Sequence, residues 1–232
     1  MKSLADKIKS AVYFATELNL WLTLKANLHY VGWRNIFKIP YLVYSGTQIR
    51  AWGGAEIHGQ MKPGLVTIGG GGIGTLDFKN ERTIWDNRGT IVFSGRADFG
   101  KGSRISVDER GVLEIGAGFH LSGRSSIICN HRIVLGNDLL LSWDILIMDS
   151  DFHPIKPKDS NDVINNPKEI VIGNHVWIGC RSMILKGVTI CDNVVLAAGS
   201  VITRSIETPD CVVTSTGGPI QVIKEHITWD EQ

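Results

Sequence analysis

The chain has 232 residues, 43% hydrophobic and 20% charged, which suits one large folded domain and excludes a disordered chain. Lysine and arginine total 24 against 23 for aspartate and glutamate, a net charge of +1. Proteins that grip nucleic acid through its phosphates usually carry a basic excess, so no nucleic-acid partner is expected. Glycine is frequent, at 26 residues, and proline sparse, at 7, which favours many tight corners in ordered structure.

The cysteines indicate a reducing compartment. They are widely spaced and form no CxxC pair, so we expect no metal site and take the cytoplasm as the default location. The first ten residues lack the apolar core of a secretory signal, and no window approaches the roughly 20 apolar residues of a membrane-spanning helix.

Residues 1–45 are predicted to be a helical capping segment. Behind a capping Ser3, apolar residues from Leu4 to Leu18 recur at spacings of three and four. The stretch that follows interleaves aromatic with basic residues, namely Trp21, Tyr30 and Trp33 with Lys25, Arg34 and Lys38. Two interpretations stay open. The segment is a helix pair covering one end of the main domain, or it contacts a membrane, which would place the protein at the inner face of that membrane.

A six-residue repeat dominates the rest of the chain. An aliphatic residue falls on every sixth position at Ile172, Ile178, Ile184, Ile190, Leu196 and Ile202. Neither an alternating strand nor a helix has this period, and a parallel β-helix does. The pattern recurs upstream with slips in phase, from Phe93 onward. We therefore predict a β-helix over residues 46–224, followed by a short tail at 225–232.

The repeat breaks once, where His153 occupies the position of the next aliphatic after Ile147. A polar, proline-bearing stretch follows before the repeats resume at Ile172, so residues 154–169 are predicted to leave the coil as a loop. Loops on a rigid scaffold often carry binding and catalytic residues.

The stretch VIGNHVWIGCRSMILKGVTICDNVVLAAGSVITRSI, with DSDFH before it and GGPIQVIK after it, resembles the hexapeptide-repeat acyltransferases. Within them it is most similar to the branch of maltose and galactoside O-acetyltransferases and bacterial capsule or lipopolysaccharide O-acetyltransferases. The resemblance is sharp from about residue 115 to 224. It implies an all-β fold, a left-handed parallel β-helix, here with the short N-terminal helical segment. It further implies a homotrimer with an active site between neighbouring subunits, acetyl-CoA as donor and a carbohydrate acceptor.

The resemblance places the catalytic base at His153, because the family's histidine also stands just ahead of such a loop in a D-x-D-x-H context. Imidazole titrates near neutrality and can take the proton of an attacking hydroxyl. Asp149 and Asp151 lie on the same side of an extended segment, and either could hold the imidazole in one tautomer. Ser122 stands where the family has an asparagine, so either Ser122 or backbone N–H groups would supply the oxyanion contact.

The family's coenzyme A positions also carry over. They fall on Trp177, Cys180, Ala198, Thr203, Arg204, Gln221 and Lys224. Ala198 would offer its backbone to the pantetheine amides, and Arg204 a cation to a phosphate. Lys224 keeps one cation of the C-terminal motif, whereas Gln221 replaces the other.

Three alternatives remain. The first is N-acetylation of an amino sugar or sugar nucleotide, although residues 1–60 show none of the nucleotide-binding βαβ unit that many such enzymes add. The second is a zinc hydratase of the γ-carbonic-anhydrase type, with candidate ligands His120, His131, His153 and His175. Their spacing does not match a coil of about 18 residues. The third is a catalytically inactive β-helical scaffold.

Overall fold

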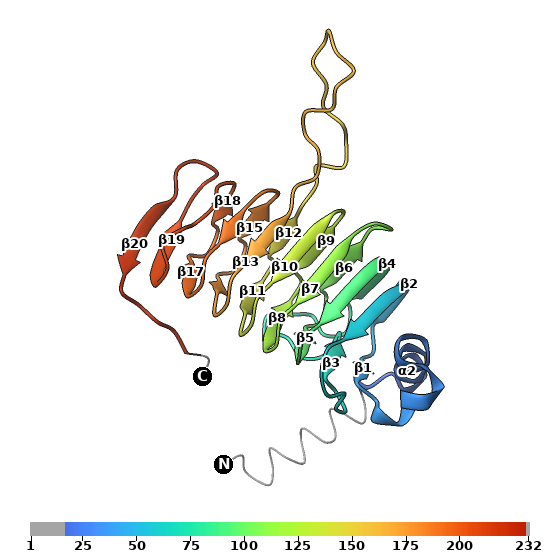
Figure 1. Cartoon of the computed structure of the whole chain (residues 1–232). Helices are drawn as coiled ribbons and strands as arrows, with labels where there is room; N and C mark the ends of the chain where they lie inside the picture. Colours follow the sequence, from blue (N-terminus) through green and yellow to red (C-terminus); the bar gives the residue numbers. More distant parts are fainter. Residues whose placement is uncertain (1–16, 231–232) are drawn as a thin grey trace.

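The structure is a computed structural model that describes residues 17–230, which form a stack of parallel coils with a helix at one end (Figure 1). Each turn of the chain adds one strand to each of three sides. Side 1 is a nine-stranded sheet of β1 (Tyr41–Val43), β3 (Val66–Ile68), β5 (Ala97–Phe99), β8 (Phe119–Gly123), β11 (Leu140–Trp143), β14 (Trp177–Ile178), β17 (Val194–Leu196), β19 (Cys211–Thr214) and β20 (Gln221–Glu225).

Sides 2 and 3 are two limbs of an eleven-stranded sheet that meet at the long strand β4 (Thr83–Phe93), which pairs with β2 (Thr47–Ile57). From the first half of β4, side 2 runs through β6 (Arg104–Val107), β9 (Ser126–Cys129), β12 (Leu146–Met148), β15 (Met183–Leu185) and β18 (Val201–Ile202). From its second half, side 3 runs through β7 (Val112–Ile115), β10 (Arg132–Leu135), β13 (Ile170–Ile172) and β16 (Thr189–Ile190). The described strands pair in parallel except β19 with β20.

The six-residue repeat maps directly onto the three sides. Its aliphatic residues point inward, each no more than 1% exposed, at Ile172, Ile178, Ile184, Ile190, Leu196 and Ile202. Each stacks on its equivalent one coil away, as Ile184 does on Ile202. Because one coil cannot bury its own face, this stacking is what stabilises the fold. The predicted coil of parallel hexapeptide strands is confirmed.

The slips in phase have a geometric cause. Ile105 pairs with Ile127, 22 positions later, whereas Ile184 pairs with Ile202, 18 positions later. The earlier coils therefore have longer corners. Their interior also holds larger side chains, and the buried rings of Phe99 and Phe119 lie 5.3 Å apart.

Helix α2 (Leu20–Asn35) closes the first end of side 1, and the 3₁₀ turn η1 (Ile36–Lys38) follows it. The Asn19 side chain caps the helix by accepting from the Leu22 N–H. Two buried polar side chains of the helix bond the outer backbone of β1, which would otherwise be an unpaired sheet edge. Asn27 donates to the Tyr41 carbonyl at 2.8 Å and accepts from its N–H at 3.1 Å. Thr23 bonds both backbone groups of Val43 in the same way.

The first strand of the stack, β1, begins at Tyr41 and pairs in register with β3. The helix predicted from Ser3 to Leu18 lies almost entirely outside the described residues. Within residues 17–230, no helix is both long and apolar enough to cross a lipid bilayer.

Between β12 and β13 the chain leaves the stack and returns, and Figure 1 shows this projecting loop, residues 149–169, standing out from the body of the molecule. The interruption of the repeat thus marks a physical departure from the coil. It begins at the corner between sides 2 and 3.

Candidate active site

His153 lies at the root of the projecting loop and is exposed. Its backbone is held at both ends of the residue: the N–H donates to the Asp151 carbonyl at 2.7 Å, and the carbonyl accepts from the Asn165 side-chain amide at 2.8 Å. The imidazole itself has no hydrogen-bond partner within residues 17–230. A fixed backbone with an unengaged imidazole is a suitable arrangement for a group that accepts a proton from a substrate.

Asp149, predicted as one candidate to orient that imidazole, occupies a different place. Its carboxylate is fully buried and accepts from three consecutive backbone amides of the neighbouring coil, those of Asn130 (2.7 Å), His131 (2.8 Å) and Arg132 (2.9 Å). Both oxygens of the carboxylate are occupied by these three N–H donors, and leaving the donors without an acceptor would be costly. We therefore assign Asp149 to the support of the loop, whose return it also fixes by accepting from the Lys168 N–H through its own carbonyl.

Asp151, the second candidate, closes the neck of the loop. Its Oδ2 accepts from the Asn165 side-chain amide at 2.9 Å and forms an ion pair with Lys186. The hydrogen bond from Lys186 is the main reason that the pKa of Asp151 is lowered, and the Asn165 amide adds to it. Asp151 thus acts on the segment that carries His153 and not on its imidazole.

Sequence reasoning missed Asn165 and Lys186. Asn165 bonds both arms of the neck, because its side chain also accepts from the Ile155 N–H at 2.6 Å. Lys186 donates to the Asn165 carbonyl at 2.8 Å in addition to pairing with Asp151. Polar residues at the end of a loop excursion were the only available signal for Asn165, and none pointed to Lys186.

A hollow of about 290 Å³ opens beside His153. Arg110 and Asn130 line it from the coil, and Phe152 and Pro167 from the loop. It offers space next to the imidazole for a small polar group.

The predicted coenzyme A positions near the middle of the stack lie on side 1 and its corner. Trp177 in β14 is 38% exposed, and its indole N–H donates to Ser142 at 3.2 Å. Cys180 and Ala198 lie one coil apart at the corner between sides 1 and 2. There the backbone packs closely, since a Cβ on Gly179 would lie 2.6 Å from the Ala198 nitrogen. Ala198 is exposed at this corner.

The remaining predicted cofactor positions cluster at the C-terminal end. Thr203 and Arg204 follow β18, and the Thr203 hydroxyl donates to the Gly217 carbonyl at 2.9 Å. Gln221 and Lys224 are exposed on β20. Within the described part of the chain neither Arg204 nor Lys224 has an ion-pair partner, so both cations are available to an anionic ligand.

Ser122 lies on side 1, on β8. Its neighbours Leu121 and Gly123 pair with Leu141 and Trp143, so Ser122 stands opposite Ser142 on β11. The two hydroxyls therefore lie on one line along side 1. Trp177 pairs with Leu140, two residues before Ser142, and its indole reaches this line through its bond to Ser142. His153, at the corner between sides 2 and 3, is not brought to this line within a single chain.

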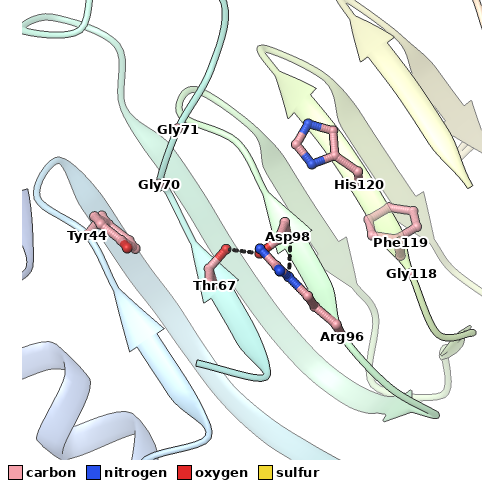
Figure 2. A pocket seen from close by; sticks show the side chains of 9 residues that line it. All are labelled: Tyr44, Thr67, Gly70, Gly71, Arg96, Asp98, Gly118, Phe119 and His120. Atoms are coloured by element: carbon pink, nitrogen blue, oxygen red, sulfur yellow. Dashed lines mark hydrogen bonds and ion pairs between the residues drawn. The ribbon is translucent and has the colours of Figure 1, made fainter. Parts of the chain in front are cut away.

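A hollow with a volume of about 510 Å³ lies near the first strands of side 1 (Figure 2). Thr67, Asp98 and His120 enter it from three neighbouring strands in register. Asp98 accepts from the Thr67 hydroxyl at 2.7 Å and from Arg96 at 2.8 Å, as Figure 2 shows. The His120 imidazole makes no hydrogen bond to any described residue. Sequence reasoning did not single out this polar pocket.

The four histidines considered as zinc ligands lie in different places, and His131 lines a hollow with Asp108 and Glu109. His120 is in the side 1 pocket, and His153 is at the loop. His175 stacks on Trp229 with ring centroids 4.2 Å apart and bonds Asn193 through Nδ1 at 2.9 Å. The geometry gives the carbonic-anhydrase alternative no convergent ligand set among the described residues.

Residues 169–204 match the family described as bacterial transferase hexapeptide (six repeats), in agreement with the three-sided coil and its six-residue repeat. The chain is 33% identical over 129 residues to the polysialic acid O-acetyltransferase of Escherichia coli O1:K1 / APEC, covering 56% of this chain and 39% of that protein. It is 33% identical over 115 residues to the galactoside O-acetyltransferase of Escherichia coli (strain K12), covering 49% and 54%. The predicted resemblance to hexapeptide-repeat acyltransferases is confirmed.

The chain spans about two fifths to one half of the length of these two curated relatives. Among solved structures, the crystal structure of the polySia-specific acetyltransferase NeuO matches with a TM-score of 0.51 and 21% identity. The match covers 83% of this chain and 79% of that one. At this identity the likeness establishes the shared fold alone.

Proposed function

We propose that the protein is an acetyl-CoA-dependent O-acetyltransferase that acetylates a sugar hydroxyl of a surface polysaccharide or its precursor. The observation that carries the proposal is the unengaged imidazole of His153, held at the root of the projecting loop of a hexapeptide-repeat coil. The O-acetyltransferase names of the relatives support the reaction class, and their saccharide names support a carbohydrate acceptor.

In the proposed reaction, the His153 imidazole takes the proton of the acceptor hydroxyl as its oxygen attacks the thioester carbonyl of acetyl-CoA. The carbon–sulfur bond then breaks, the acetyl group stays on the sugar oxygen, and the coenzyme A thiolate leaves and is protonated. Between the attack and the breaking of this bond, negative charge develops on the carbonyl oxygen. Ser122 or a backbone N–H supplies the donor to that oxygen.

We propose further that the active site forms between two copies of the chain in a homotrimer of left-handed coils. The argument is that His153 and the line of Ser122 and Trp177 lie on different sides of one coil. A neighbouring copy that presents its side 1 to the loop would bring the base and the donor positions together. Coenzyme A would then run along side 1 past Cys180 and Ala198 toward Thr203, Arg204, Gln221 and Lys224.

The side 1 pocket is the proposed place of the acceptor. Planar carboxylate and guanidinium groups such as Asp98 and Arg96 bond adjacent sugar hydroxyls well, and the charges of this pair cancel. The pocket therefore suits a polar, uncharged ring.

We place the protein in the cytoplasm, with which its four free cysteines are compatible.

Substitution of the base tests the proposal. His153→Ala should lower turnover by about 10²–10⁴-fold while acetyl-CoA affinity stays nearly unchanged. Release of free coenzyme A thiol, measured over a panel of sugars and lipid-linked oligosaccharides, gives the rate. His58→Ala is the matched control, since that imidazole is also exposed and pairs with Glu56 at the surface. Turnover near the wild-type rate in His153→Ala would exclude the mechanism.

The same assay separates the alternatives. N-acetylation of an amino sugar would give an amide product that resists the mild alkali that cleaves an ester. A scaffold would release no thiol with any acceptor and would not bind acetyl-CoA.

A further inference from the structure

The outward side of α2 and η1 is an unusually apolar surface. Its large side chains are all at least 50% exposed: Leu20 (74%), Trp21 (71%), Leu24 (50%), Leu28 (52%), Trp33 (72%) and Phe37 (91%). We call these six residues the α2–η1 surface. A hollow of about 490 Å³ lies within it, between the helix and Ile39. Large exposed apolar patches of this kind mark interaction sites on protein surfaces.

Helix α2 differs from an ordinary surface helix in the residues that it buries, because an ordinary surface helix turns its apolar residues to the core. Here the buried positions of α2 are Thr23, Ala26 and Asn27, and two of these are polar. Thr23 and Asn27 face inward because they bond the edge of β1. Leu22, Tyr30 and Val31 are partly buried against the core. The leucines and tryptophans of the α2–η1 surface face solvent, so the coil does not use these apolar side chains.

The charged side chains within the stretch that carries this surface have one sign. Residues 18–55 contain no aspartate or glutamate, whereas Lys25, Arg34, Lys38 and Arg50 are all basic and exposed. Lys25 and Arg34 lie over the rings of Trp52 and Trp33, at 4.8 and 5.6 Å from the ring centroids. Within the described chain none of the four cations forms an ion pair. The chain as a whole is nearly neutral, so this local excess is a specific feature.

We propose that the α2–η1 surface docks on an anionic lipid bilayer, with its indoles and leucines in the interfacial layer and its cations on the headgroups. Amphipathic segments with this combination bind membrane surfaces, and tryptophan favours the interface. Each cation near an anionic leaflet adds attraction that salt screens. If the α2–η1 surface docked on another protein instead, it would not require a stretch without acidic residues and with cations around the apolar side chains.

The side 1 pocket lies at the same end of the stack, since Tyr44 lines it directly after β1, the strand that α2 covers. If the proposed function holds, docking would present this pocket to an acceptor carried on a membrane lipid. The docking itself does not depend on the reaction, so the two proposals can fail separately.

Vesicle flotation of the purified full chain tests the docking. The protein should float with vesicles of phosphatidylcholine and phosphatidylglycerol, bind pure phosphatidylcholine much more weakly, and dissociate as salt is raised. Trp21→Ser/Trp33→Ser/Phe37→Ser should abolish flotation without unfolding, since all three side chains are exposed. Lys25→Gln/Arg34→Gln/Lys38→Gln should lower partitioning into the anionic vesicles by about a hundredfold.

Ile164→Ser is the matched control, because Ile164 is a similarly exposed apolar residue (63%) in the projecting loop, and it should float like the wild type. Three results would overturn the proposal. The first is no flotation of the wild type with either vesicle. The second is flotation that survives the aromatic variant but is lost in Leu4→Ser/Ile8→Ser, which would assign binding to the first residues. The third is concentration-dependent self-association that the aromatic variant removes, with no vesicle binding, which would make the surface a contact between copies.

Discussion

The ammonium group of Lys186 and the carboxylate of Asp151 form an ion pair across the neck of the projecting loop. Lys186 follows β15, one coil beyond the strand from which the loop departs. Its Nζ also reaches the Asn165 carbonyl on the returning arm. One side chain therefore ties both arms of the loop to the rigid stack, and through Asp151 and Asn165 it holds the backbone of His153.

In the proposed reaction, with His153 as the base, this geometry makes Lys186 and Asp151 positioning residues. Lys186→Met and Asp151→Ala should each lower kcat about tenfold with little change in the KM of acetyl-CoA, because the base stays present but is held less well. Lys186→Arg keeps the cation and should restore most of kcat. Steady-state kinetics with both substrates measure the split. An effect confined to thermal stability would assign the pair a purely structural role.

The lowered pKa of Asp151 gives this neck a pH dependence. A carboxylate whose pKa is lower in the folded than in the unfolded state contributes stability above its unfolded pKa, and loses that contribution as pH falls through the folded pKa. We expect the neck to stay closed at neutral pH and to open only below about pH 4. Hydrogen exchange of the Ile155 and Ile164 amides, corrected for intrinsic rates, should rise there in the wild type. In Asp151→Ala it should already be raised at neutral pH.

The coil could be predicted from sequence because a six-residue period has one structural solution, in which an isoleucine such as Ile178 and a leucine such as Leu196 fill equivalent inward positions. The long first coils were harder to delimit, because corner lengths vary without changing the inward residues. The left-handedness of the coil is an expectation that rests on the family resemblance alone.

The site was predicted less completely, for a physical reason. His153 could be found because it interrupts the period. The role of Asp149 depends on three amides of the turn before β10, which stacking brings beneath it from the preceding coil. Such contacts join residues whose separation in sequence varies with the length of the corners. The contacts of Lys186 across the loop are of the same kind. No local motif encodes them.

Asp149→Ala should destabilise the fold markedly. The substitution leaves three partly buried backbone N–H groups without their acceptor, and each such loss costs about 1–3 kcal/mol. We expect the free energy of unfolding to fall by about 3 kcal/mol or more, measured by urea denaturation. Asp159→Ala, an exposed carboxylate at the far part of the loop, should change it by less than about 0.5 kcal/mol. Equal stability of the two variants would contradict the supporting role.

The side 1 pocket, as the proposed acceptor site, predicts that substitutions in it change the KM of the sugar acceptor and not that of acetyl-CoA. Asp98→Asn and His120→Ala should raise the KM of the sugar acceptor by about tenfold, the cost of about one hydrogen bond, and leave the KM of acetyl-CoA unchanged. Glu114→Gln is the matched control, because Glu114 also pairs with an arginine, Arg132, but on side 3. A rise in the KM of acetyl-CoA instead would move the acceptor site away from this pocket.

The unpaired cations at the C-terminal end predict how the donor binds. Arg204→Ala and Lys224→Ala should each raise the KM of acetyl-CoA about tenfold at low salt, because each removes a charge-assisted contact to a phosphate. The difference from the wild type should shrink as salt is raised, since exposed charges are screened. Arg82→Ala removes another exposed arginine without an ion pair in the described chain and should leave the KM unchanged. If kcat fell while the KM stayed constant, these cations would act on the reaction and not on the binding of the donor.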